Sequence, residues 1–191
     1  MNRSELTGII LAGGKSSRMG REKGLVEFHG KPLIQYGIDL LSQLTDRILI
    51  SSGNPDYRVF DRELVPDEIT GQGPAAGLAA SLKYSNTKWN LVIACDLPFL
   101  EAEFVDCLLE AEGDFQAVIP THDNGIYEPL AALYHKDLSP IFEVSVNSGN
   151  LALHKILATC KVHYLDADTL IDKFPQLFTN FNSLKELNLF R

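Results

Sequence analysis

The sequence predicts an α/β fold, a three-layer α/β/α sandwich in which helices cover both faces of a mostly parallel β-sheet. Three observations support this prediction: apolar, β-branched runs that end in turn residues, stretches of helical period between them, and the alternation of the two along the chain. With 191 residues and 45% hydrophobic content, the chain is long enough for one well-packed domain, which we place at residues 1–191.

Five apolar runs are typical of strands that are buried on both faces of a sheet. They are short, rich in Ile, Val and Leu, and bounded by turn residues. The runs are "LTGIILA" (6–12), "RILISS" (47–52), "WNLVIACD" (89–96), "FQAVIP" (115–120) and "KVHYLD" (161–166). A further strand, antiparallel to its neighbour, is predicted in "EPLAALYH" (128–135), which follows the fourth run after a short loop and is placed to form a hairpin with it.

Four stretches with the apolar spacing of helices lie between the predicted strands. Pro32, Pro74 and Glu101 stand at their starts, where the first turn of a helix favours proline or negative charge. The predicted helices cover residues 32–44, 74–85, 101–112 and 150–159.

Charge and cysteine content exclude several classes of function. A formal net charge of −8 argues against a nucleic-acid or anionic-membrane surface, because both need an extended basic face. Three widely spaced cysteines, Cys95, Cys107 and Cys160, indicate a reduced protein rather than a disulfide framework. The first apolar run is too short for a signal-peptide core or a membrane span, so we expect a cytoplasmic protein.

The segment "LAGGKSSRMGREKG" (11–24) has the composition of a phosphate-binding loop. It begins where the first strand should end, and open α/β sheets bind ligands at the carboxyl ends of their strands. Its first glycines allow the main chain to approach a ligand closely. Against one acid, Glu22, it gathers four cations: Lys15, Arg18, Arg21 and Lys23.

Three alternatives to this interpretation stand beside it. A Walker A loop fails by one residue, and its variable positions would be the strand residues Ile-Ile-Leu-Ala. A dinucleotide fingerprint at "GQGPAAG" (71–77) follows a poor strand and lacks the acidic partner. The segment could also be a solvated surface loop, and solvation is the favoured role for Arg21.

Several motifs resemble those of nucleotidyltransferases. The first, "LAGGKSSRMGREKGL", is similar to the LAGGxxxRMGxxKxL signature of nucleotidyltransferases with a Rossmann-like, glycosyltransferase-A-type core. The later segments occur in the order found in molybdenum cofactor guanylyltransferases of the MobA type. They are "SSGN" (51–54), "VPDEITGQGPAAGL" (65–78), "IACDLPFL" (93–100), "EPLAALY" (128–134) and "FTNFNSLKEL" (178–187).

This resemblance implies the fold of the nucleotide-diphospho-sugar transferases and a role for individual residues. Asp96 would hold Mg²⁺, and Asn180 and Asn182 would lie on the acceptor side. Contacts with the nucleotide are implied for Leu11, Ala12, Gly13, Lys23, Asn54, Asp67 and Asp96. The sequence departs from the family at Glu22, usually Asp, at Ala75, usually Leu, and at Ser183-Leu184, usually Thr-Pro.

The implied reaction transfers GMP from GTP to molybdenum-molybdopterin, with cofactor-insertion proteins and apo-molybdoenzymes as further partners. Such a transfer brings two anions together, so it needs a metal and cations rather than a general base. Arg18, Lys23 and Asp96 are therefore the predicted catalytic residues. The alternatives are a nucleotidyltransferase that uses CTP or another small phosphate acceptor, and a nucleotide-binding protein without turnover.

Purely structural roles stay open for three predicted site residues. Asp96 and Asp67 could cap turns, and Asn182 could cap the helix "SLKELN" instead of contacting a ligand.

Overall fold

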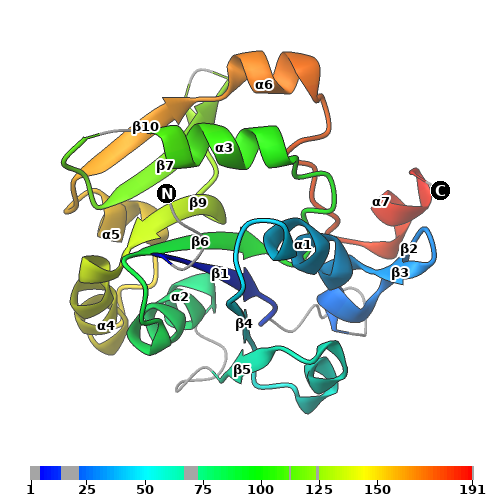
Figure 1. Cartoon of the computed structure of the whole chain (residues 1–191), viewed down its shortest axis with the longest axis horizontal. Helices are drawn as coiled ribbons and strands as arrows, with labels where there is room; N and C mark the ends of the chain where they lie inside the picture. Colours follow the sequence, from blue (N-terminus) through cyan, green and yellow to red (C-terminus); the bar gives the residue numbers. More distant parts are fainter. Residues whose placement is uncertain (1–4, 14–21, 67–72, 112, 124, 191) are drawn as a thin grey trace.

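The computed structural model describes residues 5–13, 22–66, 73–111, 113–123 and 125–190 (Figure 1). Within these residues eight strands form a central sheet in the order β10–β7–β9–β6–β1–β4–β5, with β8 paired to β7. Their bounds are β1 (Leu6–Leu11), β4 (Ile48–Ser51), β5 (Glu63–Val65), β6 (Trp89–Ala94), β7 (Ala117–His122), β8 (Ile126–Tyr127), β9 (Ala131–His135) and β10 (Val162–Asp166). A separate hairpin consists of β2 (Glu27–Phe28) and β3 (Lys31–Pro32).

The central sheet is mostly parallel, and β9 is the strand that reverses inside it. β1 pairs in parallel with β4 and β6, β4 with β5, and β7 with β10. β9 lies between β6 and β7 and runs antiparallel to both, and the two-residue β8 is also antiparallel to β7. The predicted parallel sheet with an added antiparallel strand is therefore confirmed.

Helices cover both faces of this sheet (Figure 1). Side chains of α1 and α3 enter the core cluster on one face, and side chains of α2, α4 and α5 enter the cluster on the other. The helix bounds are α1 (Leu33–Ser42), α2 (Gly73–Tyr84), α3 (Ala102–Glu110), α4 (Ser139–Asn147), α5 (Leu153–Leu157), α6 (Asp168–Lys173) and α7 (Leu184–Asn188). The three-layer α/β/α architecture is confirmed.

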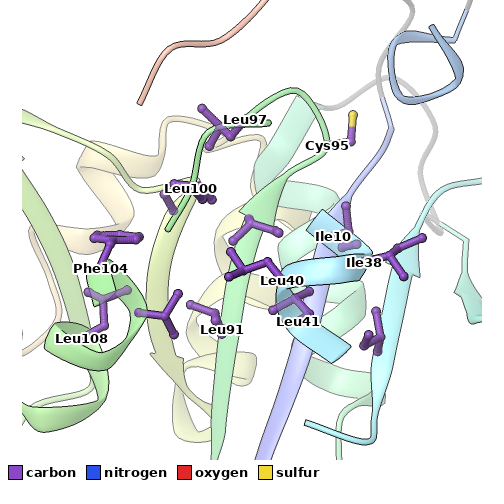
Figure 2. Close-up of a cluster of buried hydrophobic side chains, with 14 of the residues drawn as sticks. Ile10, Ile38, Leu40, Leu41, Leu91, Cys95, Leu97, Leu100, Phe104 and Leu108 are labelled. Carbon is purple, nitrogen blue, oxygen red and sulfur yellow. The ribbon is translucent and has the colours of Figure 1, made fainter. Parts of the chain in front are cut away.

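Alternate side chains of the central strands enter opposite layers, as strand geometry requires. Ile9 packs toward α2, whereas Ile10 packs toward α1, and both are fully buried. Figure 2 shows the layer beneath α1 and α3, where Leu41 and Phe104 meet Leu91 of β6 and its neighbours. Continuous apolar runs in the sequence therefore correspond to strands that are covered on both faces.

Two predictions about the outer elements are wrong. β10 was expected to be buried on both faces, but it forms an edge of the sheet and leaves Tyr164 51% exposed. The helix expected at residues 150–159 is only the short α5, and the preceding "SPIFEVSVN" forms α4, which the sequence did not predict. Its Ile, Val, Phe and Ser residues have low intrinsic helix propensity, so packing against α2 stabilises this helix.

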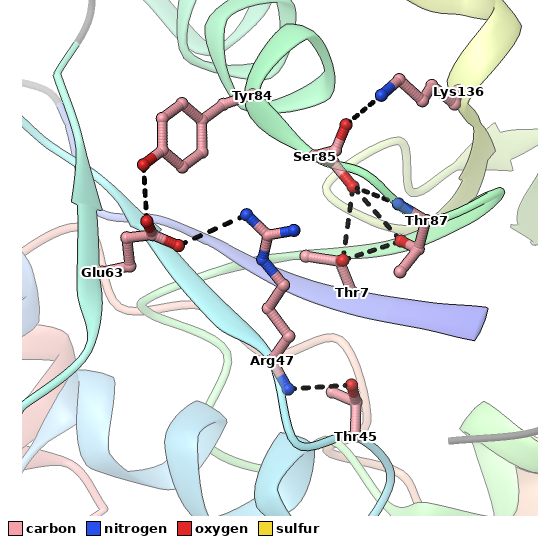
Figure 3. Close-up of polar contacts among 8 residues, drawn as sticks. All are labelled: Thr7, Thr45, Arg47, Glu63, Tyr84, Ser85, Thr87 and Lys136. Atoms are coloured by element: carbon pink, nitrogen blue, oxygen red, sulfur yellow. Dashed lines mark hydrogen bonds and ion pairs between the residues drawn. The ribbon is translucent and has the colours of Figure 1, made fainter. Parts of the chain in front are cut away.

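Polar residues tie the strands together at the amino-terminal edge of the parallel sheet (Figure 3). The Thr87 hydroxyl donates to the Thr7 hydroxyl at 2.7 Å, and Arg47 pairs with Glu63 at 3.4 Å. The Lys136 ammonium donates to the carbonyl oxygen of Ser85, just after α2. These contacts stabilise the edge opposite the one where α/β folds bind ligands. None of the helices in the described ranges has the length and hydropathy that a membrane-spanning segment requires.

Candidate active site

The candidate site lies at the carboxyl-terminal edge of the sheet, where β1, β4 and β6 end beside one another. Ala12 N–H donates to Ser51 O at 3.0 Å, and Cys95 N–H donates to Leu11 O at 3.1 Å. These two bonds hold the segments that leave the three strands side by side. Asp96, one residue farther along, consequently lies next to the end of the first strand, as the sequence predicted.

Lys23 and Asp96 form an ion pair at this edge, although 73 positions separate them in the sequence. Lys23 begins a short 3-10 helix, Lys23–Leu25, and its ammonium donates to Oδ2 of Asp96, which lies in the turn after β6. The side chain of Asp96 is 9% exposed and that of Lys23 is 20% exposed. Because little water screens the two charges, their attraction is stronger than that of a surface ion pair.

Asn182 joins this pair from the C-terminal part of the chain. Its Oδ1 accepts a hydrogen bond from Lys23 Nζ at 3.0 Å, and its Nδ2 donates to Oδ1 of Asn180 at 3.0 Å. Phe181, between the two asparagines, is fully buried. The two amides thus lie together on one side of the segment, while the ring between them lies in the core.

The alternative that Asn182 caps the C-terminal helix is wrong. Ser183 is the N-cap of α7, and its hydroxyl accepts from Glu186 N–H at 3.2 Å. Glu186 in turn accepts from Asn182 N–H at 2.7 Å, which holds the pKa of the Glu186 carboxyl below its usual value. Ser183 thus starts the helix where the family usually has threonine, and the Asn182 side chain is left for the site.

A small aromatic cluster places the asparagine segment beside Lys23. The Phe181 ring lies 5.0 Å from that of Phe28 in the β2–β3 hairpin and 5.3 Å from that of Phe190, with Phe99 packed against all three. Figure 1 shows the C-terminal segment running past the end of α3 to α7, beside this hairpin. The members of the cluster are far apart in the chain, so no pattern in the sequence predicted it.

The turn of the β2–β3 hairpin has a local feature in the sequence that predicts it. His29 and Gly30 connect its strands and have φ values of 46° and 82°. Two consecutive residues with positive φ are typical of the tight turn that joins antiparallel strands. The dipeptide between "EF" and "KP" could therefore have indicated the hairpin.

The close approach of Tyr57 explains the glycine that follows Lys23. A Cβ atom on Gly24 would lie 2.8 Å from the Tyr57 hydroxyl oxygen, and Tyr57 is fully buried and unable to move aside easily. Gly24 therefore lets the short helix that carries Lys23 lie directly on the core.

Two other titratable side chains of this region, Cys95 and Tyr57, do not ionise near neutral pH. Burial raises the pKa of the Cys95 thiol, and the neighbouring charge of Asp96 raises it further. Burial also raises the pKa of the Tyr57 hydroxyl. Both groups stay protonated and neutral, so neither is a nucleophile in this site.

The predicted nucleotide-binding residues have different surroundings. The side chains of Leu11 and Ala12 are buried in the two core layers. The carbonyl of Leu11 and the amide of Ala12 form the backbone hydrogen bonds described above between the strand ends. Gly13 is the first exposed residue after β1. Asn54, after β4, uses its Oδ1 to accept from Asp56 N–H at 2.9 Å. The predicted contacts of these residues with a nucleotide stay predictions.

Two predicted site residues, Arg18 and Asp67, lie outside the described residues. The alternative of a Walker A loop is wrong, because Gly8, its first glycine, lies within β1 with the apolar residues that follow it. The site of the described residues thus consists of one cation, one carboxylate and two amides, drawn from three separate parts of the chain.

Comparisons with known proteins show the family of this chain. Residues 8–164 match the family described as MobA-like NTP transferase domain. A probable molybdenum cofactor guanylyltransferase from Flavobacterium johnsoniae is 32% identical over 96% of this chain and 95% of its own length. The molybdenum cofactor guanylyltransferase of Vibrio vulnificus is 31% identical, over 95% of this chain and 93% of its own.

A solved structure shares the fold over nearly the whole length. It is the molybdopterin-guanine dinucleotide biosynthesis protein A of Archaeoglobus fulgidus, with a TM-score of 0.82, 27% identity, and coverage of 96% of this chain and 95% of that chain. The CMP:2-keto-3-deoxy-manno-octonic acid synthetase complexed with CTP has a TM-score of 0.76 at 12% identity, which shows the common fold alone. This chain therefore belongs to the MobA-like NTP transferase family, together with the molybdenum cofactor guanylyltransferases, and is a nucleotidyltransferase.

Proposed function

We propose that this enzyme transfers GMP from Mg·GTP to the terminal phosphate of molybdenum-molybdopterin, forming molybdopterin guanine dinucleotide and pyrophosphate. The observation that carries the proposal is the meeting of Lys23, Asp96 and Asn182 at the ligand-binding edge of a nucleotidyltransferase fold. The names of relatives that match the chain over almost its whole length support the choice of GTP and of the acceptor.

The reaction forms one phosphoanhydride bond and breaks another. An oxygen of the acceptor phosphate attacks the α-phosphorus of GTP, and the bond from that phosphorus to the β-phosphate oxygen breaks as pyrophosphate leaves. The acceptor phosphate is already largely ionised near neutral pH, because its second pKa is about 6, so no side chain has to remove a proton. Repulsion between the two anions is the obstacle that the enzyme has to overcome.

Lys23 would neutralise the charge on the departing pyrophosphate. In the structure two of the three N–H donors of its ammonium bond to Asp96 and Asn182, and the third would serve a phosphate oxygen. Asn182 and Asn180 would then donate their amide hydrogens to the acceptor. Arg18, outside the described residues, would add a planar donor that grips two phosphate oxygens at once.

Asp96 fits the requirement for Mg²⁺ only when the nucleotide is present. No group of three or more His, Cys, Asp or Glu side chains that could hold a metal occurs among the described residues. Mg²⁺ binds through one or two carboxylates and completes its shell with phosphate oxygens and water, so a single buried carboxylate at a phosphate site is suitable. When bound, the ion would supply positive charge to the phosphate oxygens of the nucleotide.

The family connection also suggests where the product goes. We infer that cofactor-insertion proteins and apo-molybdoenzymes in the cytoplasm receive the dinucleotide. A pull-down of these proteins with the product-loaded enzyme tests this, and loss of capture after product removal is the expected result.

Turnover with different nucleotides tests the proposed function. Purified enzyme is given molybdenum-loaded molybdopterin and either GTP or CTP, and pyrophosphate release is measured with and without Mg²⁺. We expect release with GTP and Mg²⁺ only. Equal or faster release with CTP would overturn the choice of base, and binding without release would indicate a nucleotide-binding protein instead.

A further inference from the structure

His122, at the end of β7, is held by carboxylates on both of its ring nitrogens. Nε2 lies 3.1 Å from Oε1 of Glu128, and Nδ1 lies 3.2 Å from Oδ2 of Asp123. The imidazole is 11% exposed. A ring that faces an acceptor at each nitrogen satisfies both only when it carries both protons, so the imidazolium is the form that fits these surroundings.

The same imidazole lies flat against Phe178, which belongs to the segment that leads to the asparagines. The two ring centroids are 5.3 Å apart at an interplanar angle of 13°. On another side, Phe178 meets the edge of Phe104 at 5.2 Å and 88°, and Phe104 of α3 is fully buried in the layer shown in Figure 2. Phe178 is therefore fixed between the imidazole of His122 and a core side chain.

Anchors on both sides determine where the asparagine segment lies. Leu177 and Phe178 fix its beginning, and Phe181 fixes its end in the aromatic cluster. Two backbone amides add to these contacts: Thr179 N–H donates to Gln176 O at 2.8 Å, and Asn182 N–H donates to the side-chain carboxylate of Glu186 at 2.7 Å. Because the lowered pKa of Glu186 keeps that carboxylate ionised near neutral pH, the anchor at Phe178 is the one that contacts a group able to titrate there.

We propose that His122 is a positioning residue for the acceptor half of the site, because its contacts with Glu128 and Phe178 hold the segment that carries Asn180 and Asn182. The assignment of this segment to the acceptor rests on the proposed function. The positioning itself rests on the contacts of the imidazole.

The charged side chains that contact the His122 ring among the described residues are acidic. Glu128 and Asp123 contact the ring, and Asp123 N–H donates to Oδ1 of Asp168 at the start of α6, next to Asp166 of β10. Burial alone lowers the pKa of His122, but the hydrogen bonds and charges of Glu128 and Asp123 outweigh it and raise the pKa above 6.5. The imidazole therefore donates to both carboxylates at low pH, and it loses one of these two hydrogen bonds as pH rises through the raised pKa of His122.

His122→Phe tests the proposal, because it keeps a ring against Phe178 and removes both polar contacts. The matched control is His163→Phe on β10, where the imidazole stacks on Phe115 at 5.2 Å and 23°, near the amino-terminal end of β7. Amide hydrogen exchange of the segment 177–182 is measured in both variants without substrate. We expect exchange of the Thr179 and Asn182 amides to become about tenfold faster in His122→Phe and to stay unchanged in His163→Phe.

Steady-state kinetics provide the second measurement. His122→Phe is expected to raise KM for molybdenum-molybdopterin about tenfold, while KM for GTP changes by less than about twofold. In the wild type, KM for molybdenum-molybdopterin should rise with pH by more than ionisation of the acceptor phosphate explains, because His122 loses a proton. His122→Phe should abolish this additional rise. Glu128→Gln keeps an acceptor oxygen but removes the charge, so it should move the pH midpoint of the rise downward.

The outcomes separate this proposal from the proposed function. If wild-type enzyme releases no pyrophosphate from GTP, the proposed function is wrong, and hydrogen exchange alone decides whether His122 positions the segment. Unchanged exchange in His122→Phe, or equal changes in His163→Phe, overturns the positioning role. If KM for GTP and KM for molybdenum-molybdopterin rise equally in an active His122→Phe enzyme, the role of His122 is not restricted to the acceptor half of the site.

Discussion

The ammonium of Lys23 donates a hydrogen bond to the carboxylate of Asp96, the residue that we propose as the ligand of Mg²⁺. Lys23 thus places a cation of the protein itself against this carboxylate. This partner offsets the cost of a buried charge at Asp96. It also means that a metal ion has to compete with Lys23 for the same group.

Lys23→Met should show this competition directly. In the absence of nucleotide, Mn²⁺ titrated by electron paramagnetic resonance is expected to bind about tenfold more tightly to the variant than to the wild type. Turnover should nevertheless fall by about 10²-fold or more, because the pyrophosphate loses its counter-charge. Lys31→Met is the control, since Lys31 forms an exposed ion pair with Asp39 at 2.6 Å. Unchanged Mn²⁺ affinity in Lys23→Met would show that the two cations do not compete.

Asp96→Asn should abolish Mg²⁺-dependent turnover while the fold persists. The amide keeps the size of the side chain and accepts a hydrogen bond from Lys23, but it is a poor ligand for Mg²⁺. We expect pyrophosphate release to fall by about 10²-fold or more, with an unchanged far-ultraviolet circular dichroism spectrum. Asp39→Asn removes an exposed carboxylate and should leave turnover unaffected. Normal turnover in Asp96→Asn would remove Asp96 from the mechanism.

Gly24→Ala should destabilise the protein through Tyr57. The new methyl group would approach the buried hydroxyl oxygen to 2.8 Å, so the short helix with Lys23 or the ring has to shift. We expect a loss of about 1–3 kcal/mol, measured as a decrease in Tm of roughly 3–10 °C, together with reduced turnover.

Two further variants show whether that contact is the cause. Gly53→Ala places a methyl group where no atom lies within 4 Å, and it should leave Tm unchanged. Adding Tyr57→Phe to Gly24→Ala removes the obstructing oxygen and should restore much of the lost stability. A double variant no more stable than Gly24→Ala would locate the strain elsewhere.

Asn182→Ala should weaken acceptor binding more than nucleotide binding. The substitution removes the amide that bonds to Lys23 and Asn180, whereas Phe181 and the aromatic cluster stay in place. KM for molybdenum-molybdopterin is expected to rise about five- to tenfold, with the Kd for GTP, measured by calorimetry, changed by less than about twofold. Asn147→Ala on α4 serves as the control. A larger effect on GTP than on the acceptor would place Asn182 on the nucleotide side.

The core of the fold was predictable because its information is local. Ile9 and Ile10 belong to a run that only a strand covered on both faces explains, and Asp96 follows a second such run. Parallel strands end at one edge, so the proximity of Lys23 and Asp96 followed from the order of elements and the family motif.

The missed features depend on contacts between distant residues. No spacing in the sequence relates Phe28, Phe99 and Phe181, and α4 is stabilised by α2 despite its weak propensity. Asp123 adjoins His122 in the sequence, but the contacts of the ring with Glu128 and Phe178 become evident only in three dimensions. The His29–Gly30 turn, by contrast, was a local signal that went unused.

The reversal of β9 has a topological consequence for the edge of the sheet where β1, β4 and β6 end. A strand parallel to its neighbours would deliver only its last residue to the ligand edge, whereas here β7 arrives at that edge with His122 and β9 departs from it just after Glu128. Two neighbouring strands thus both contribute side chains there, within a width of roughly 5 Å. Inverting one strand thus lets two neighbouring strands reach the same edge of the sheet through a short connection.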